Sequence, residues 1–431
     1  MLTFIVVWLG QIVSIIGSGL TGFVLGVWIF EQTGDATPFV LIALFGSLPT
    51  VILSPIAGAL VDRWNRRLVM IFSDVGAALT TLLIFLLFSS GQLQVWHIFI
   101  TSFLNSVFAS FQQPAYSASV TMLVPKEHFA RASAMIQTGQ SISGMLSPLI
   151  AGLLFAIIGV RGVILIDFVT FFVAIGTLIV VRIPQPEKSQ PDDEKPSLKK
   201  EIAFGFSYLK DRPGLFGLAI FIMMVNLVIS SVIVLSTPMI LSFTDAKTLG
   251  IVQTISSLGM FLGGVLVSIW GGTKRKMHGI YLGVTISGLG LAFAGAQASG
   301  VWIAVSLFIF LFPITLVNAS IRAITQTKVP PDIQGRIFSI LFMLARSSVP
   351  IGYLLAGPLA DQVFEPMMAS GGILAGSLGQ VIGVGPGRGI GLMFIIAGFG
   401  MWLATLVMVL YPRLRLVEDE LPDMVPDSPQ T

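Results

Sequence analysis

The chain reads Gly58-Ala59-Leu60-Val61-Asp62-Arg63-Trp64-Asn65-Arg66-Arg67 between two long apolar runs. One carboxylate and three guanidinium groups stand within six positions of this stretch. Burying a charged side chain in hydrocarbon costs roughly 3 kcal/mol or more per residue. We therefore predict a tight turn at a membrane surface, with one membrane-spanning helix entering it and another leaving it.

The composition of the whole chain is typical of a membrane protein. Of its 431 residues, 55% are hydrophobic and only 10% are charged, whereas soluble domains contain roughly 25% charged residues. The mean hydropathy is +0.92. Because the charges are clustered, many segments of about 20 residues are nearly free of charge, and this length spans a bilayer as a helix.

Several kinds of chemistry are not indicated by the sequence. The chain has no cysteine, and its three histidines are scattered, so we expect no metal site and no cofactor. The net charge of +3 is explained by Lys and Arg retained on the cytoplasmic side, so we expect no nucleic-acid partner. No G-x-x-x-x-G-K-[ST] motif occurs, so the chain has no ATPase motif, and we do not expect an enzyme.

Hydropathy predicts twelve spans, at about 4–30, 38–61, 68–90, 95–119, 134–158, 162–182, 214–242, 247–270, 279–298, 301–325, 337–364 and 389–411. With both termini in the cytoplasm, all but four of the 24 Lys and Arg residues fall in inside loops or at inner helix ends. The exceptions are Arg161, Lys247 and Arg388 in outer loops and Arg346 within a span. This bias predicts that both termini are cytoplasmic.

The predicted spans form two groups of six. A Pro-rich, charged segment divides the chain into residues 1–183, a cytoplasmic linker at 184–213, residues 214–412, and a cytoplasmic tail at 413–431. In the linker, apolar residues from Leu198 to Leu209 recur at helical spacing beside lysines, which predicts an amphipathic helix on the lipid of the inner leaflet. The tail beyond Arg415 is acidic and Pro-rich, and we expect it to be disordered and without a role.

The two groups of spans repeat each other. The stretch Pro125-Lys-Glu-His-Phe-Ala-Arg131 returns 205 positions later as Pro330-Pro-Asp-Ile-Gln-Gly-Arg336. The turn at residues 58–67 returns in weakened form, with Ser268 in place of Asp62. A parallel duplication of six spans explains both repeats. We predict an all-α membrane protein with two pseudo-symmetric six-helix bundles.

The pattern G-x-x-x-D-R-x-x-R-R at residues 58–67 resembles the signature loop between spans 2 and 3 of the major facilitator superfamily. With Phe111-Gln-Gln-Pro-Ala115, Val124-Pro125 and Gly335-Arg336, the chain also resembles the bacterial drug:proton antiporter branch that includes macrolide and enterobactin exporters. This resemblance implies a twelve-helix fold, alternating access, a monomer and the bacterial inner membrane.

The resemblance also implies a gating motif. Its residues are Gly58, Asp62, Arg63, Arg66, Arg67, Arg131 and Arg336. In the family this loop abuts the start of span 11, so we expect Asp62 to lie against the amide groups at that helix N-terminus, with Arg336 close by. Such a contact would latch the two halves together. The alternative is that Asp62 only caps its own loop.

Ionisable residues inside predicted spans are candidates for proton transfer. They are Asp167, Asp361 and Asp74. Asp74 is close enough to the membrane surface to pair with Arg66 or Arg131, which favours a structural use. Asp167 could pair with Arg161 or face a cavity.

In this superfamily, spans 1, 4, 7 and 10 line the substrate cavity. In this sequence the polar candidates on those spans are Gln11, Ser18, Asn105, Gln112, Gln113, Asn226, Ser230 and Asn318. Each could instead form an ordinary hydrogen bond between helices. As a set they are neutral and lie among aromatic residues, which suits a small, amphipathic, mostly uncharged substrate.

Three functional hypotheses follow. The first is a proton antiporter that exports a macrolide-like drug, a siderophore or a peptide-type secondary metabolite. The second is a facilitator or lysolipid flippase of the same fold without proton coupling. The third is a scaffold or sensor that transports nothing, which two intact halves without a signalling domain make less attractive.

Overall fold

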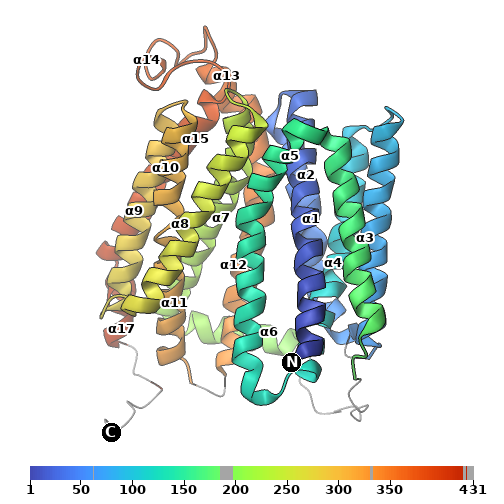
Figure 1. Ribbon diagram of the computed structural model, residues 1–431. Coiled ribbons are helices and arrows are strands. Elements are labelled where there is room, and N and C mark those ends of the chain that lie inside the picture. Colours follow the sequence, from blue (N-terminus) through green and yellow to red (C-terminus); the bar gives the residue numbers. More distant parts are fainter. Residues whose placement is uncertain (62, 185–197, 331–332, 421–423, 425–431) are drawn as a thin grey trace. The chain divides into compact units, whose positions relative to one another are not determined.

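The computed structural model describes residues 1–61, 63–184, 198–330, 333–420 and 424. The helices of the first half are α1 Leu2–Thr33, α2 Ala36–Val61, α3 Arg66–Ser89, α4 Val95–Leu123 and α5 Phe129–Val180, with a 3₁₀ turn at Lys126–His128 (Figure 1). Those that follow are α6 Leu198–Lys210, α7 Pro213–Leu241, α8 Ala246–Trp270, α9 Lys276–Ala296, α10 Gly300–Leu311, α11 Ile314–Lys328 and α12 Gln334–Leu359. The chain continues through a π-helical turn at Ala360–Phe364, α13 Glu365–Met368, α14 Gly379–Ile382, α15 Arg388–Leu410, α16 Pro412–Arg415 and α17 Val417–Glu420.

The residues divide into two compact units. One unit comprises Met1–Pro191 and Ile240–Thr254, and the other comprises Asp192–Met239 and Ile255–Thr431. The second unit thus lacks the end of α7 and the beginning of α8, which pack with the first. The domain boundaries of the sequence analysis stay a prediction.

Among the described residues, ten helical segments are long and apolar enough to cross a membrane. One of them, Lys126–Val180, contains predicted span 5 and nearly all of predicted span 6. These meet at Gly159, whose φ of 63° lies in the left-handed region that only glycine adopts readily. Predicted span 10 comprises α10 and α11, which meet at Pro313, a residue without an N–H to donate. The all-helical membrane fold is confirmed, and the count of twelve stays a prediction.

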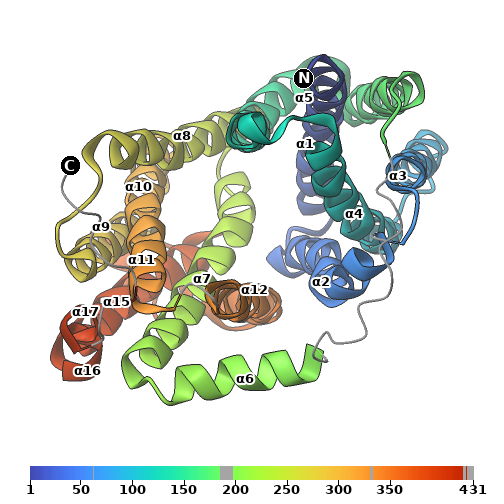
Figure 2. The same cartoon turned by 90° about the horizontal axis from the view of Figure 1, so that it is seen from below.

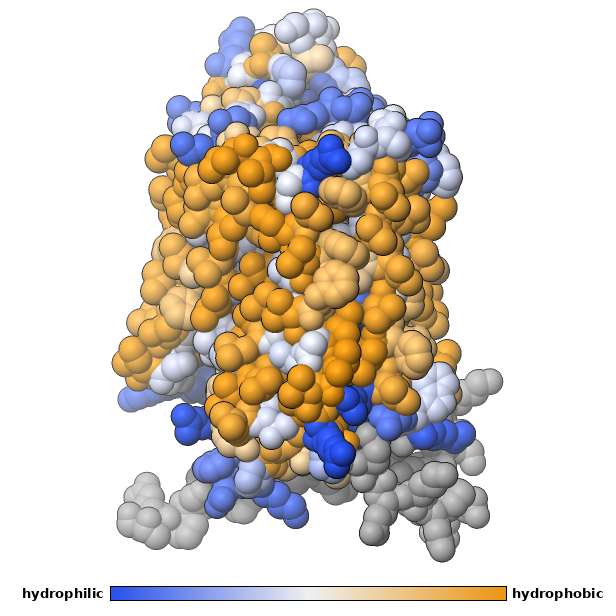
Figure 3. All heavy atoms as spheres, turned by 45° about the vertical axis from the view of Figure 1, so that its right-hand side comes forward, coloured by the Kyte–Doolittle hydropathy of each residue, from blue (hydrophilic) through white to orange (hydrophobic). Residues whose placement is uncertain are grey.

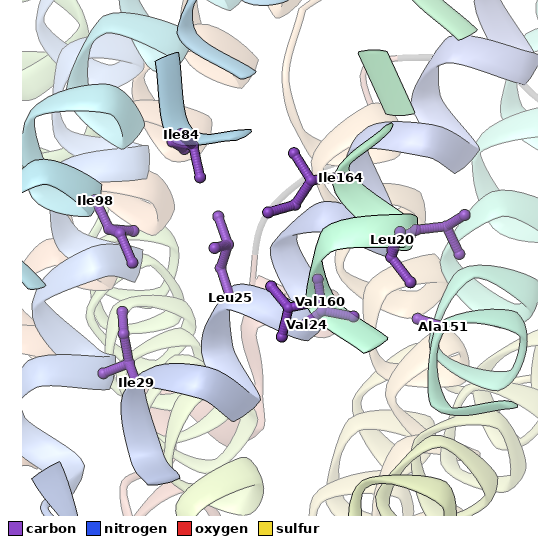
Figure 4. Packing of buried hydrophobic residues seen from close by; sticks show 10 residues of the cluster. Leu20, Val24, Leu25, Ile29, Ile84, Ile98, Ala151, Val160 and Ile164 are labelled. Carbon is purple, nitrogen blue, oxygen red and sulfur yellow. The ribbon is translucent and has the colours of Figure 1, made fainter. Parts of the chain in front are cut away.

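The first unit is held together by apolar side chains between α1, α3, α4 and α5. Figure 4 shows this core, formed by Leu20, Val24, Leu25, Ile29, Ile84, Ile98, Ala151, Val160, Val163 and Ile164. Residues of α1 face those of α5 along much of their length, and Figure 1 shows these two helices side by side. This packing fixes which face of α1 points toward the other helices.

The surface carries large exposed apolar side chains. Ile157, Phe172 and Val180 are 77%, 59% and 82% exposed. Hydrophobic residues cover the middle of the face seen in Figure 3, and hydrophilic residues gather at its two ends. A soluble protein would rarely expose so much contiguous apolar surface, so this face is suited to contact with lipid.

Helices α9 and α15 approach each other through glycines. A Cβ atom added at Gly295 would lie 2.0 Å from the carbonyl oxygen of Gly391, and one at Gly398 would lie 2.5 Å from that of Gly288. Small residues allow this close backbone contact between helices in membranes. The glycines of α9 and α15 are therefore needed for packing in the second unit.

The predicted amphipathic helix is present as α6. Gly205 lies against Ile340 of α12, and Leu209 is buried, whereas Phe204 and Phe206 are exposed. Figure 2 shows α6 beside α12. The first half of the predicted linker, residues 185–197, lies outside the described residues.

The beginning of the C-terminal tail is ordered, so the expectation that it has no structural role is wrong for residues 416–420. The carboxylate of Glu418 in α17 accepts hydrogen bonds from the backbone N–H groups of Lys276 and Met277, at 2.8 and 2.9 Å. These donors stand at the N-terminus of α9, where N–H groups have no partner within the helix. Lys328 donates to the carbonyl oxygen of Glu418. Figure 2 shows α17 close to α9.

Replacing Glu418 with Ala is expected to lower the free energy of unfolding by about 1 kcal/mol, because a helix N-terminus loses its cap. Thermal unfolding of the purified protein in detergent measures the effect. Asp419→Ala, which removes the same charge from an exposed neighbour, is the control and should change little. Equal midpoints for the two variants would contradict the capping role.

Candidate functional site

Asp74 of α3 is buried and receives two amide donors. Gln11 Nε2 of α1 donates to Asp74 Oδ2 at 3.2 Å, and Gln112 Nε2 of α4 donates to Asp74 Oδ1 at 2.9 Å. The same Gln112 nitrogen donates to Gln11 Oε1 at 3.0 Å. Three helices therefore meet at one carboxyl group through neutral side chains.

Glycines bring these helices close enough for the contacts. A Cβ at Gly76 of α3 would lie 2.4 Å from the ring of Phe108 on α4, and one at Gly10 of α1 would lie 2.5 Å from Thr177 of α5. Gly76 is two residues after Asp74, and Gly10 directly precedes Gln11. The close approach at these glycines sets the positions of the neighbouring polar side chains.

Asp167 of α5 is the second buried carboxyl group of this unit. Ser18 Oγ of α1 donates to Oδ1 at 3.3 Å, and Thr81 Oγ1 of α3 donates to Oδ2 at 3.4 Å. Both bonds are long, since O–H···O distances in proteins cluster near about 2.7–2.8 Å. The carboxyl group is thus held loosely, and its side-chain partners are neutral hydroxyl groups.

The two carboxyl groups lie along the same polar stripe. On α1 this stripe is formed by Gln11, Ser14 and Ser18, spaced three and four residues apart on one helix face. On α3, Asp74 and Thr81 are seven residues apart, which is about 10 Å along a helix axis. Ser14 is buried between the two contacts. The first unit therefore has a row of polar groups that runs from the buried Gln11 and Ser14 to Ser18, which is exposed.

The charged partners that we expected for these acids are not the ones in the structure. Asp74 is bound by Gln11 and Gln112 rather than by Arg66 or Arg131. The prediction that Asp74 forms an ion pair is wrong, because the facing helices α1 and α4 present amides at its depth.

For Asp167, the alternative of pairing with Arg161 is also wrong. The guanidinium group of Arg161 lies over the ring of Phe85, 5.5 Å from its centroid. The hydroxyl groups of Ser18 and Thr81 take its place beside the carboxyl group.

Two arginines of the signature loop bind backbone carbonyl groups. Arg66 Nη1 donates to the carbonyl oxygen of Ala118 at 2.9 Å. Arg67 donates through Nε to Leu178 at 2.7 Å and through Nη2 to Ile179. Leu178 and Ile179 stand in the last turn of α5, where carbonyl groups lack partners within the helix. These arginines thus fasten the start of α3 to α4 and to the end of α5.

Replacing Arg67 with Lys is expected to destabilise the protein by about 1–3 kcal/mol, because an ammonium group cannot donate to two adjacent carbonyl oxygens with the fork geometry of a guanidinium. Thermal unfolding measures the change. Arg63→Lys is the matched control, since Arg63 is exposed in the same loop. A loss of stability in both variants would argue against the specific role of Arg67.

The remaining residues of the predicted gating motif are only partly described. Asp62 lies outside the described residues, and only the backbone of Arg336 is described. Arg131 is exposed. A Cβ at Gly58 would meet no described atom within 4 Å. The predicted latch therefore stays a prediction.

The predicted cavity residues divide into four groups. Gln11, Gln112 and Ser18 bind the two acids, as described above. Asn105 accepts a hydrogen bond from Thr80 of α3 at 2.9 Å. Asn226 and Ser230 donate to carbonyl oxygens of their own helix, Ile222 and Leu227. Gln113 and Asn318 are exposed.

Sequence reasoning missed Thr80 and Thr81. A signal was present, because these two hydroxyl residues follow Asp74 by about two turns on the same span. The third predicted acid, Asp361, stands in the π-helical turn Ala360–Phe364, a type of turn that is often found at functional sites. Within the described ranges, no group of three His, Cys, Asp or Glu side chains could hold a metal ion.

Comparison with known proteins assigns the family. The family model of the Major Facilitator Superfamily matches residues 7–353. Macrolide efflux protein A of Streptococcus pyogenes is 28% identical over 385 residues, covering 84% of this chain and 90% of the relative. The multidrug efflux pump Tap of Mycolicibacterium fortuitum is 23% identical over 412 residues, covering 93% of both chains.

Solved structures agree on the fold. The nucleoside transporter NupG matches with a TM-score of 0.69 at 14% identity, covering 95% of this chain and 100% of that one. An auto-inhibited peptide transporter of the POT family also has a TM-score of 0.69, at 12% identity, and the match covers 99% of both chains. With the superfamily model matched over most of its length, the chain belongs to the major facilitator superfamily and is a multi-pass membrane transporter.

Proposed function

We propose that this transporter exports small amphipathic molecules by alternating access and is driven by protons that enter in exchange. The observation that carries the proposal is the pair of buried carboxyl groups, Asp74 and Asp167. Their side-chain partners among the described residues are amides and hydroxyl groups, with no cation.

Carboxyl groups inside a membrane protein are costly when ionised and mark proton pathways in pumps and transporters. A carboxylate without a cation favours uptake of a proton when its site closes to water, because an unpaired charge is poorly solvated there. Opening to water on the other side of the membrane favours release. Asp167, with its long hydrogen bonds, is our first candidate for the carrier, and Asp361 is the second.

The proposed substrate class rests on two supports. Predicted cavity residues such as Asn105, Asn226 and Asn318 are neutral, which suits an uncharged solute with polar and apolar faces. Relatives named macrolide efflux protein A and multidrug efflux pump point to the same class. We therefore propose a macrolide-like drug, a siderophore or a peptide-type metabolite.

The remaining parts of the proposal concern orientation and gating. The Lys and Arg bias supports both termini in the cytoplasm, and the bacterial relatives support the bacterial inner membrane as the location. We propose that Asp62 latches the halves near Arg336, that α6 rests on lipid of the inner leaflet, and that the transporter works as a monomer. Unchanged export by an Asp62→Asn variant would argue against the latch.

Inverted membrane vesicles test the function. A radiolabelled macrolide should accumulate in vesicles that contain the transporter and have an acidic interior, and a protonophore should abolish the accumulation. Vesicles from cells without the transporter give the background. Movement of a labelled lysolipid without any gradient, together with no macrolide uptake, would favour the facilitator or flippase instead.

A further inference from the structure

The hydrogen bonds around Asp74 leave one acceptor without a donor. Each of the two hydrogens on Gln112 Nε2 has an acceptor, Asp74 Oδ1 and Gln11 Oε1. Gln112 Oε1 is buried and accepts no hydrogen bond from the described residues. A buried amide oxygen in this condition costs about 1–3 kcal/mol.

The arrangement fits an ionised Asp74, because a carboxylate only accepts hydrogen bonds and both facing amides donate. A protonated Asp74 has an O–H group that must find an acceptor. Rotating the terminal amide of Gln112 would present Oε1 to this O–H. That torsion has a broad, roughly two-fold profile, so the rotation requires little energy.

We propose that Gln112 and Gln11 form an amide clamp that senses whether Asp74 carries a proton and transmits this state to α4 and α1. In the ionised state, Gln112 links α4 to both α3 and α1. When water delivers a proton to Asp74, the new O–H donates to Gln112 Oε1, and the Gln112 nitrogen turns away from Gln11. The bond between Gln112 and Gln11 is then broken.

The contacts around the clamp allow the amide group of Gln112 to rotate without a movement of the helices. Gly76 keeps α3 against Phe108 of α4, so the amide can rotate while the two helices stay in contact. The link that opens is the one between Gln112 and Gln11, on α4 and α1. In the family's architecture, α4 and α1 are two of the helices that bind substrate. This step of the inference rests on the proposed function.

Few other groups near the clamp can exchange protons. Titratable side chains on the described helices around Asp74 include Tyr116, one turn beyond Gln112 on α4, and Asp167 on α5. On α3 itself, Arg66 and Arg67 lie about two turns before Asp74 and donate to backbone carbonyl oxygens of α4 and α5. On α1, the residues around Gln11 are uncharged.

Infrared difference spectroscopy of the purified full-length protein tests the clamp. The C=O stretch of protonated Asp74 is identified as the band that Asp74→Asn removes from acid-minus-neutral spectra. In the wild type the O–H of protonated Asp74 donates to Gln112 Oε1, while its C=O oxygen, Oδ2, keeps the hydrogen bond from Gln11. Both hydrogen bonds lower the C=O frequency, so Gln112→Leu, which removes the acceptor of the O–H, should move the band to higher frequency. Gln92→Leu should leave it in place, since Gln92 is exposed in the turn between α3 and α4.

A transport assay completes the test. The pH at which export is half-maximal should shift in Gln112→Leu and should not shift in Gln92→Leu. If Gln112→Leu does not fold, Gln112→Asn, which keeps the amide on a shorter side chain, replaces it and should move the band in the same direction.

A band that stays in place in the folded Gln112 variant would overturn the clamp. A shift of equal size in Gln92→Leu would do the same. The infrared measurement needs neither substrate nor gradient. A shifted band in a protein whose export ignores protons would therefore refute the proposed coupling and leave the clamp standing.

Discussion

Replacing Asp167 with Asn is expected to abolish proton-driven accumulation of substrate while the protein still folds. Asn has nearly the same shape, and its amide can be satisfied by the hydroxyl groups of Ser18 and Thr81, because a hydroxyl both donates and accepts. It cannot bind or release a proton in the physiological range. The loss should therefore affect coupling and leave downhill exchange of substrate intact.

A pH-sensitive dye inside inverted vesicles measures proton movement when substrate is added, and the labelled substrate is followed in parallel. Asp35→Asn is the matched control, because Asp35 is exposed in the turn between α1 and α2. Accumulation with unchanged pH dependence in Asp167→Asn would exclude this residue as the carrier. The same pair of measurements on Asp361→Asn then tests the second candidate.

A large effect on stability is expected from Gly295→Ala. The added Cβ would lie 2.0 Å from the carbonyl oxygen of Gly391. A backbone atom cannot move out of the way by changing a rotamer, so α9 and α15 must separate. Overpacking of this kind costs typically about 1–3 kcal/mol. The buried Arg388, which donates to the carbonyl oxygen of Gly295, would be displaced as well.

Gly400→Ala provides a sharp control on the same interface helix α15. A Cβ at Gly400 would meet no described atom within 4 Å. Because Ala is about 1 kcal/mol better than Gly in a helix interior, this substitution should be neutral or slightly stabilising. The same Gly→Ala change is thus expected to lower the midpoint of thermal unfolding at Gly295 and to leave it unchanged or raise it slightly at Gly400. A midpoint of Gly295→Ala at or above the wild-type value would contradict the packing argument.

The sequence identified several parts of the site but could not pair them. Asp74, Asp167, Gln11, Gln112 and Ser18 were all candidates, yet the expected partners of the acids were arginines. In a membrane both lipid-facing and buried helix faces are apolar, so periodicity does not tell which residues face inward. The rotation of each helix about its axis decides the partners, and that rotation depends on where helices touch.

The C-terminal tail and the arginines Arg66 and Arg67 also make contacts that could not be predicted from the sequence. Composition alone made the tail beyond Arg415 resemble a disordered segment. It could not show that Glu418 caps α9, because that contact joins positions 142 residues apart. Likewise, the sequence did not reveal that Arg66 donates to a carbonyl oxygen within α4 and Arg67 to carbonyl oxygens in the last turn of α5, and their gating role stays a prediction.

What the sequence by itself determined is the membrane location, the approximate ends of the helices and the superfamily. These follow from local properties, since apolar length, clustered charge and the motif at residues 58–67 can each be recognised without knowing what packs nearby. Only the tertiary structure decided that Asp74 meets Gln11 and Gln112 and that Asp167 meets Ser18, 149 residues away. The physical reason is that these hydrogen bonds join separate helices, and close contacts at glycines such as Gly10, Gly17 and Gly76 bring those helices together.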